Sequence, residues 1–279
     1  MGRIFIGSEA LESGALTRYE LRTDYRRILP DIYGPRRDEL TLHDRTTAAW
    51  LWSKRDGIVS GLAASAMHGA KWVDVDSPIE LNWANHKPPS GVITRNETLL
   101  DDEIARADGI AMTTAERTAF DLARRGRIGQ AVARLDALAR ATDFKAEDVK
   151  SLASRHPHVK GLRRVDRVLD LVDAGAESPK ESWLRLLLMD EGFPRPQTQI
   201  PVPGPDGHPL YYLDMGWEDA MIAVEYDGDD HRERPRWGND IVRSEYVAHV
   251  GWTLIRVVAG NRRPEIVLRV NRAWALRWR

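Results

Sequence analysis

The sequence predicts an α+β protein in which a small winged helix and a small α/β region precede a mixed-sheet α/β sandwich. Three observations predict this fold class: the order helix, helix, strand pair near the N-terminus, alternating strand patterns between residues 70 and 112, and the order helix, strand, strand, helix, strand, helix in the last hundred residues. The domains that we predict are residues 1–56 (winged helix), 57–155 (α/β region), 156–176 (linker helix) and 177–279 (sandwich).

Composition excludes several classes of protein. At roughly 100–200 residues per domain, 279 residues predict two or three domains. The absence of cysteine excludes disulfides and thiolate metal sites. No apolar run is long enough to span a membrane, and the N-terminus lacks the apolar core of a secretory signal. We therefore expect a cytoplasmic protein without a membrane partner.

The N-terminal region reads as short helices followed by a strand pair. Thr17 and Glu20 fit a capping box, which predicts a helix to about Tyr25. Residues 26–35 predict strand and turn, because proline and glycine interrupt them. Two further helices are expected. Asp44 would cap the first, and Ser60 would cap the second, which runs to about His68.

The middle region alternates strand and helix patterns. Residues 73–83 alternate apolar and polar side chains, which predicts a strand, and Thr113 with Glu116 fits another capping box. The remaining predicted elements are strands at 91–94 and 109–113, a helix at about 128–141, and one amphipathic helix ending near Gly175.

The last hundred residues predict the sandwich. Ser178 and Glu181 open a helix that has proline at its first position and Gly192 beyond its end. The other predicted elements are strands at 210–217, 220–228 and 252–258, a helix from Asn239 to about Val250, and a final helix from Pro264.

Three carboxylates are expected to gather on two neighbouring strands of this sandwich. Asp214 ends the first strand, and Glu225 and Asp227 lie two residues apart on the second, so they face the same side. Such a cluster loses stability through repulsion and desolvation unless a cation compensates it. Oxygen ligands favour a hard ion, so the sequence predicts a Mg²⁺ or Mn²⁺ site.

The order of these motifs resembles a known nuclease family. Asp214, the run Glu225-Tyr-Asp-Gly, His231, the pair Asp240 and Arg243, and the segment at 251–257 together resemble the very-short-patch-repair-like branch of the PD-(D/E)XK nuclease superfamily. Residues 177–188 are similar to the opening helix of that family. The resemblance implies a restriction-endonuclease-like sandwich and a metal-dependent DNA endonuclease.

The resemblance also implies roles for single residues. Asp214, Glu225 and the carbonyl of Tyr226 would bind the metal, Glu181 would reach it through water, His231 would act as general base or contact the phosphate, and Asp240 with Arg243 would face the DNA. Asp227 stands where many members carry a lysine, and no lysine follows Lys180. From the residues themselves, Trp237 is a candidate for stacking on a base.

Structural alternatives remain for several of these residues. Glu181 is also the third residue of a helix cap, Arg243 could pair with Asp240 or Glu245 on a helix surface, and Asp227 could belong to a turn. His231 could be a solvated loop residue.

The N-terminal half resembles a second family. Residues 16–35, 57–70 and 112–125 look like the antitoxins of abortive-infection (AbiE) type IV toxin–antitoxin systems. The resemblance implies a DNA-binding winged helix and a toxin or antitoxin protein as partner. Four arginines are then available for phosphates, with a solvated surface as the structural alternative: Arg18, Arg22, Arg26 and Arg27.

The leading hypothesis is a metal-dependent endonuclease that a winged helix targets to double-stranded DNA, in DNA repair, defence or a toxin–antitoxin system. Two alternatives stay open. One is a non-catalytic DNA-binding antitoxin or regulator with a degenerate nuclease scaffold, which the missing lysine favours. The other is a toxin nuclease that cleaves RNA. The sequence leaves the oligomeric state and the preferred DNA site open.

Overall fold

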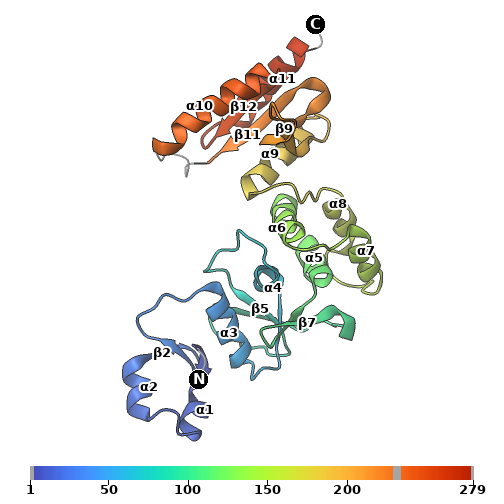
Figure 1. Cartoon of the computed structure of the whole chain (residues 1–279). Coiled ribbons are helices and arrows are strands. Elements are labelled where there is room, and N and C mark those ends of the chain that lie inside the picture. The colour runs from blue at the N-terminus through green and yellow to red at the C-terminus, as the bar shows by residue number, and fades with distance from the viewer. Residues whose placement is uncertain (1–2, 229–233, 278–279) are drawn as a thin grey trace. The chain divides into compact units, whose positions relative to one another are not determined.

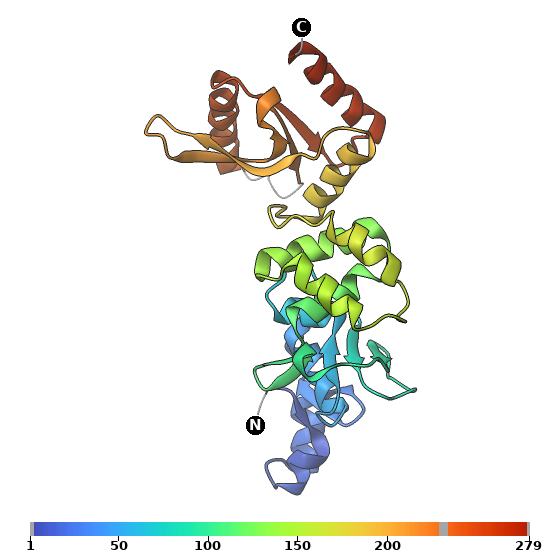
Figure 2. The same cartoon turned by 90° about the vertical axis from the view of Figure 1, so that its right-hand side faces the viewer.

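The computed structural model describes residues 3–228 and 234–277, and the chain forms two compact units. Unit 1 comprises Met1–Gly126 and Ala141–Asp170, and unit 2 comprises Arg127–Arg140 and Leu171–Arg279. Both units combine helices with a sheet (Figures 1 and 2). The predicted α+β class is confirmed.

The first part of unit 1 combines short helices with a three-stranded antiparallel sheet of order β1-β3-β2, and the winged-helix assignment of this part stays a prediction. Thr17 begins the second helix: its hydroxyl accepts the Glu20 N–H at 3.2 Å, and the Glu20 carboxylate accepts the Thr17 N–H at 2.8 Å. The predicted capping box is therefore confirmed. The elements are β1 (Phe5–Ile6), α1 (Gly7–Glu12), α2 (Arg18–Asp24), β2 (Tyr25–Leu29), β3 (Ile32–Pro35) and α3 (Leu42–Trp52).

The second part of unit 1 is built on a five-stranded mixed sheet of order β6-β5-β4-β8-β7. Its core contains Val59, Ile79, Leu81 and Met112, which are all at most 4% exposed. The elements are β4 (Ile58–Ser60), α4 (Gly61–Met67), β5 (Ile79–Asn82), β6 (Val92–Arg95), η1 (Asp101–Glu103), β7 (Ile104–Ala107), β8 (Ile110–Thr113), α5 (Ala115–Ala123), α7 (Ala146–Ser154), η2 (Leu162–Arg164) and α8 (Val165–Leu169).

Unit 2 is a sandwich around a four-stranded sheet of order β12-β11-β10-β9. The β9–β10 and β10–β11 pairs are antiparallel, and β11–β12 is parallel because α10 connects them as a crossover. The elements are α6 (Ile128–Ala141), α9 (Pro179–Asp190), β9 (Gln197–Pro203), β10 (Pro209–Trp217), η3 (Glu218–Ala220), β11 (Ile222–Asp227), α10 (Arg234–His249), β12 (Thr253–Val258) and α11 (Arg263–Arg277).

Helices cover both faces of this sheet. Leucines of α9 and apolar residues of α11 pack with Val224 and Val257 on one face. Val247 of α10 packs with Leu213 and Ala223 on the other. Figure 2 shows α10 and α11 on opposite sides of the sheet, and the β9–β10 hairpin extending beyond it. Because successive side chains of a strand face opposite sides of the sheet, neighbouring residues of β11 face different helices.

Three predicted helix starts differ from the structure. The helix α3 begins at Thr41, which forms a reciprocal box with Asp44, so Asp44 supports the cap from the third position. Thr114, not Thr113, accepts the N–H of Arg117 and caps α5. The helix α10 begins at Arg234, so Asn239 lies inside it. Ser60 precedes α4 as predicted, but its side chain makes no capping bond.

Two predicted elements are shorter than expected. In 73–83 only Ile79–Asn82 forms a strand, because Asp74 makes a turn: its carboxylate accepts the Asp76 N–H at 2.8 Å, and its carbonyl accepts the Ser77 N–H. The predicted linker helix is the five-residue α8, preceded by Gly161 at φ +87°. The left-handed backbone at Gly161 interrupts the amphipathic pattern.

The division into units places most of α6 with the sandwich rather than with the preceding α/β region. This division does not test the domain boundaries that we predict near residues 56, 155 and 176, so they stay predictions. Among the described residues, no helix is long and apolar enough to cross a lipid bilayer.

Candidate functional site

The carboxylates predicted on the two central strands of unit 2 lie together in the structure. Met215 pairs with Val224, so Asp214 and Glu225 lie one residue beyond a paired position on adjacent antiparallel strands. The Tyr226 N–H donates to Asp214 Oδ2 at 3.1 Å. We call Asp214, Glu225 and Glu181 the acid centre.

Asp214 is the acid-centre carboxylate whose pKa is raised to about 7. Burial, and after it the negative charges of Glu225 and Glu181, raise its pKa from 3.8 to about 7, against smaller lowering effects of the Tyr226 N–H and Arg243. A group with this pKa is about half ionised at neutral pH. Burial is the largest cause of the raised pKa, and repulsion from the two neighbouring carboxylates adds to it.

Glu225 is compensated by Arg243 of α10. Arg243 Nη1 donates to Glu225 Oε2 at 2.8 Å and Nη2 to Oε1 at 2.5 Å, while Nη2 also donates to the Tyr212 carbonyl at 2.8 Å. Glu225 is 3% exposed, so this is a buried two-point ion pair. Hydrogen bonding to Glu225 also raises the pKa of Arg243. The predicted surface pairing of Arg243 with Asp240 or Glu245 is not what the structure shows.

Glu181 serves both the helix start and the acid centre. Its N–H donates to Ser178 Oγ at 3.2 Å, and its carboxylate accepts the Glu177 N–H at 2.8 Å. Burial raises its pKa, and its charge contributes to the raised pKa of Asp214. Glu181 can therefore be both the third residue of a helix cap and a member of the acid centre.

Asp227 faces a cation that sequence reasoning did not assign. Arg256 Nε lies 3.8 Å from Asp227 Oδ2, and Arg256 Nη2 donates to Ser244 Oγ at 2.6 Å. In the parallel pair, Arg256 is the register partner of Glu225. The sequence contained one indication of Arg256, because it lies within the segment 251–257 that matches the nuclease motif. Its position beside Asp227, however, follows only from the parallel register of β11 and β12.

Two predicted site residues lie outside what the structure describes. His231 falls in the undescribed segment, and the side chain of Trp237 is also not described. Asp240 is described: its carbonyl accepts the Ser244 hydroxyl at 2.6 Å, and its charge helps to raise the pKa of Arg243. Asp240 thus lies near the acid centre without a direct ion pair to Arg243 among the described residues.

The acid centre has the donor chemistry of a Mg²⁺ or Mn²⁺ site. Asp214 on β10 adjoins Glu225 and the Tyr226 carbonyl on β11, so oxygen donors from two strands lie together. Mg²⁺ is commonly held by one or two carboxylates and keeps several waters. Within the described ranges, no group of three or more His, Asp or Glu side chains is arranged to hold a metal ion. A metal would therefore depend on two carboxylates, and Glu225 would share its charge with Arg243.

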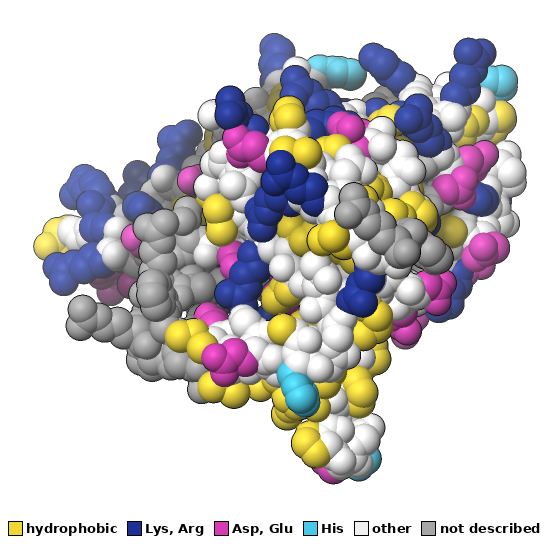
Figure 3. Space-filling view, turned by 90° about the horizontal axis from the view of Figure 1, so that it is seen from above, with side chains coloured by type: hydrophobic (Ala, Val, Ile, Leu, Met, Phe, Trp, Pro, Cys, Tyr) yellow, Lys and Arg dark blue, Asp and Glu magenta, His cyan; other side chains and the backbone are white. Residues whose placement is uncertain are grey.

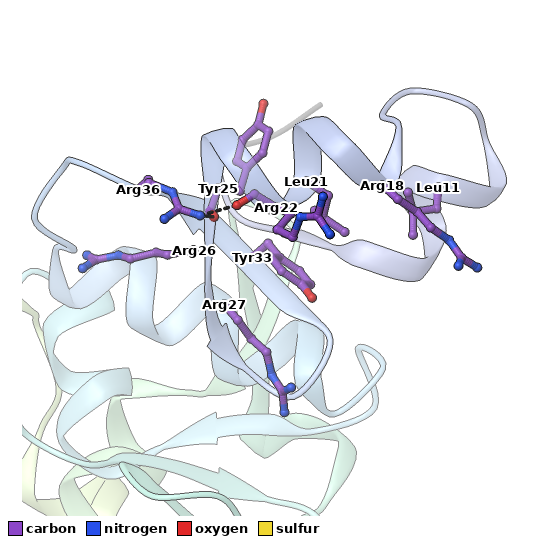
Figure 4. A pocket seen from close by; sticks show the side chains of 9 residues that line it. All are labelled: Leu11, Arg18, Leu21, Arg22, Tyr25, Arg26, Arg27, Tyr33 and Arg36. Carbon is purple, nitrogen blue, oxygen red and sulfur yellow. Dashed lines mark hydrogen bonds between the residues drawn. The ribbon is translucent and has the colours of Figure 1, made fainter.

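The four arginines predicted to contact phosphates all line one open pocket in unit 1 (Figure 4). Its volume is about 560 Å³, and its lining includes no carboxylate. In the described part of the chain, Arg18, Arg22 and Arg27 form no ion pair with a carboxylate. The full lining is Leu11, Arg18, Leu21, Arg22, Tyr25, Arg26, Arg27, Tyr33 and Arg36.

Hydrogen bonds shape this arginine pocket. Arg36 donates to the carbonyls of Arg22 and Tyr25, and Arg26 donates to the carbonyl of Asp38 at 2.9 Å. Neither contact neutralises charge. Figure 4 shows Arg18 and Arg27 extending away from the Tyr25 and Tyr33 rings. The pocket therefore concentrates positive charge around an apolar floor, which suits an anionic ligand.

Unit 2 distributes its positive charge differently. The sequence from His231 to the C-terminus contains eleven arginines and four acidic residues. In Figure 3, Lys and Arg side chains are spread over the visible face, with hydrophobic and acidic side chains between them. Among the side chains that Figure 3 draws in colour, basic groups are therefore interspersed with other residue types.

A buried ion-pair network holds the second part of unit 1. Arg117 is 1% exposed and contacts Asp121 at 3.2 Å and Glu103 at 2.5 Å. Glu103 also contacts His156 at 2.7 Å, and Arg124 pairs with Asp121 at 2.7 Å. These contacts join α5 to η1 and to the chain after α7.

Comparison with known proteins bears on this part of the chain. Residues 58–171 match the AbiEi antitoxin C-terminal domain. The matched residues include β4–β8, the buried network and α6, and they end before the acid centre. The similarity expected from residues 57–70 and 112–125 is confirmed for this domain.

Two curated relatives are uncharacterized proteins of Mycobacterium tuberculosis, one from strain CDC 1551 / Oshkosh and one from strain H37Rv. Each is 29% identical over 163 residues, which is 58% of this chain. The chain spans 60% of the length of these relatives.

Proposed function

We propose that the protein is a DNA-binding, metal-dependent endonuclease that acts in a toxin–antitoxin or related defence setting. The observation that carries the catalytic part is the placement of Asp214 opposite Glu225 on adjacent strands of unit 2, where burial and the charges of Glu225 and Glu181 raise the pKa of Asp214 to about 7. The resemblance of residues 177–260 to very-short-patch-repair-like nucleases supports this part. The AbiEi-like domain supports the biological setting.

Each residue has a physical role under this proposal. Asp214, Glu225 and the Tyr226 carbonyl would hold Mg²⁺ or Mn²⁺, and the bound ion would activate water and stabilise the leaving oxygen of a phosphodiester. Asp214 must lose its proton before it binds a cation. Arg243 and Arg256 bring positive charge to the end of β11, where a phosphate would lie. His231 remains the candidate general base.

The arginine pocket supports DNA binding by unit 1. Five guanidinium groups surround it, and none is balanced by a carboxylate of the lining. Phosphates would supply the missing negative charge, and such contacts position a protein on DNA without reading its sequence. A cytoplasmic location and a toxin or antitoxin protein as partner belong to the same proposal.

One observation favours a second function, a non-catalytic DNA-binding antitoxin or regulator. Arg243 engages both oxygens of Glu225, and Asp227 replaces the lysine of the nuclease motif, so the sandwich could be a scaffold. Cleavage of RNA by the same centre is the third reading. The DNA endonuclease, the non-catalytic regulator and the RNA nuclease predict different results in a nucleic-acid cleavage assay.

We expect full-length protein to cleave plasmid or mismatched duplex DNA with Mg²⁺ or Mn²⁺, and Asp214→Asn to abolish that cleavage. The reason is that the amide cannot supply the charge that the metal needs. Asp219→Asn, on the exposed η3 turn, is the matched control and should cleave like the wild type. Cleavage of RNA alone would select the third function. Absence of cleavage with every nucleic acid, together with retained DNA binding, would select the scaffold.

We expect the triple variant Arg18→Ala/Arg22→Ala/Arg27→Ala to weaken duplex binding and flatten its salt dependence. Each phosphate contact contributes roughly 0.9 to the slope of log K against log salt, so three lost contacts reduce the slope by up to about three. Fluorescence anisotropy in EDTA at several salt concentrations measures both quantities. The control Arg37→Ala/Arg106→Ala/Arg163→Ala removes the same charge from exposed sites of unit 1 outside the pocket. Equal effects of the two triple variants would contradict a specific role of the pocket.

A further inference from the structure

Two aromatic rings and one cation form an exposed cluster beside the acid centre. Lys180 and Trp183 lie on α9, and Tyr226 lies between Glu225 and Asp227 on β11. The Trp183 and Tyr226 rings meet edge-on with their centroids 6.3 Å apart, and Lys180 Nζ lies 5.7 Å from the Tyr226 centroid. We call Lys180, Trp183 and Tyr226 the aromatic patch.

Trp183 is more exposed than two tryptophans in the cores of this unit. Trp183 is 43% exposed, whereas Trp217 and Trp252 are 7% and 8% exposed in the two cores of the sandwich. Ser182 and Leu184, the neighbours of Trp183 on α9, are both fully buried. Residues three apart share a helix face, so Lys180 and Trp183 are presented together. Trp183 thus presents an aromatic ring, and Lys180 a cation, at one surface next to β11.

Charge indicates what the aromatic patch contacts. In the part of the chain that the structure describes, no carboxylate pairs with Lys180. Tyr226 and Glu225 alternate along β11, so Tyr226 points to the α9 side while Glu225 points to Arg243. The end of β11 therefore has a cation on each side and aromatic rings on one side. Positive charge with aromatic rings is the combination that binds single-stranded nucleic acid, where rings stack on bases and cations follow phosphates.

We propose that the aromatic patch stacks on an unpaired base of a nucleic-acid strand whose phosphate lies at the acid centre. The proposal rests on the proposed nuclease function, and it assigns single-stranded or locally unpaired nucleic acid as the substrate class. A fully paired duplex hides the faces of its bases in the stack, so a side chain reaches them only where pairing is lost. Trp183 is then a specificity-determining residue rather than a catalytic one.

The test measures binding without metal, in full-length protein carrying the triple substitution Arg18→Ala/Arg22→Ala/Arg27→Ala, which weakens the arginine pocket. The ligand is a short single-stranded DNA containing 2-aminopurine, whose fluorescence is quenched by stacking. We expect Trp183→Ala to lower the affinity about 5- to 150-fold, the range for one stacked base, and to relieve the quenching. Trp183→Phe should retain most of both effects, because phenylalanine also stacks.

Trp72→Ala is the matched control, since Trp72 is an exposed tryptophan (62%) of the other unit and should not change either readout. Unchanged affinity and quenching in Trp183→Ala would overturn the proposal. Equal weakening on a fully paired duplex would overturn the assignment of an unpaired base, and failure to bind any oligonucleotide at low salt would overturn the whole proposal. The binding assay contains no metal and therefore does not depend on cleavage. If binding depends on Trp183 but the protein never cleaves nucleic acid, the nuclease function is rejected and the stacking role is kept.

Discussion

Asp214→Asn is expected to raise the free energy of unfolding of the metal-free protein by up to about 4 kcal/mol at pH 8. Burial and neighbouring carboxylates raise the pKa of Asp214 to about 7 in the folded protein. The ordinary pKa of aspartate, about 3.9, applies to the unfolded chain. Ionising Asp214 at pH 8 therefore favours the unfolded state, and asparagine removes this contribution while keeping an oxygen to accept the Tyr226 N–H.

The pH dependence follows from the same shift. Below about pH 4 the carboxyl is protonated in both states, so wild type and variant should differ little. Between about pH 4 and 7 the unfolded chain releases the proton first, so the wild type loses stability relative to the variant as pH rises. Above about pH 7 the difference should be constant.

Urea unfolding at several pH values in EDTA measures this difference. Asp219→Asn, on an exposed turn of the same unit, is the control and should follow the wild type. Parallel pH profiles for wild type and Asp214→Asn would contradict the destabilising role of this carboxylate. Adding Mg²⁺ should then stabilise the wild type more than the variant, because only the wild type has the full charge to bind it.

Arg117→Met is expected to cost about 3–5 kcal/mol of folding free energy in unit 1. The guanidinium of Arg117 contacts Glu103 and Asp121, which are 0% and 2% exposed, and Nη1 donates to the Thr98 carbonyl at 2.9 Å. Removing the cation leaves two buried carboxylates with less compensation, which is more costly than losing the pair itself. Thermal and urea unfolding of the full-length protein measure the loss.

Arg55→Met provides the comparison for this loss. Arg55 pairs with Glu9 at 2.7 Å, but both side chains are about half exposed, so its removal should cost less than about 1 kcal/mol. Combining Arg117→Met with Glu103→Gln and Asp121→Asn should recover part of the loss, because neutral amides no longer need the cation. A loss for Arg117→Met no larger than for Arg55→Met would show that the network contributes little.

Local sequence signals predicted most helices and strands because they depend on neighbouring residues. The Thr17–Glu20 box, the Ser178 cap with proline after it, and the alternation around β10 and β11 each act within a few residues. The predicted helix 128–141 coincides with α6 for the same reason. The errors arose where a second local signal competed, as at Asp74, Thr41 and Gly161.

The acid centre was predicted in part. Asp214 and Glu225, on adjacent strands, could be placed together from strand order alone, although Asp214 lies within β10 rather than at its end as expected. The partners of those carboxylates could not, because Arg243 lies 18 residues beyond Glu225, and Arg256 reaches Asp227 only through the parallel register of β11 and β12. The same holds for the aromatic patch, whose Lys180 and Tyr226 are far apart in the chain.

The sequence by itself determined the α+β class, the caps of α2 and α9, the AbiEi-like segment and the identity of the acidic residues, since composition, periodicity and capping act over short distances. Only the tertiary structure decided which charges are compensated. Burial and long-range pairing make Glu225 an ion-paired carboxylate and leave Asp214 with a pKa of about 7, and they gather the arginines of α2 and β2 around one pocket. These outcomes depend on the local dielectric and on contacts between distant segments, which no pattern along the chain contains.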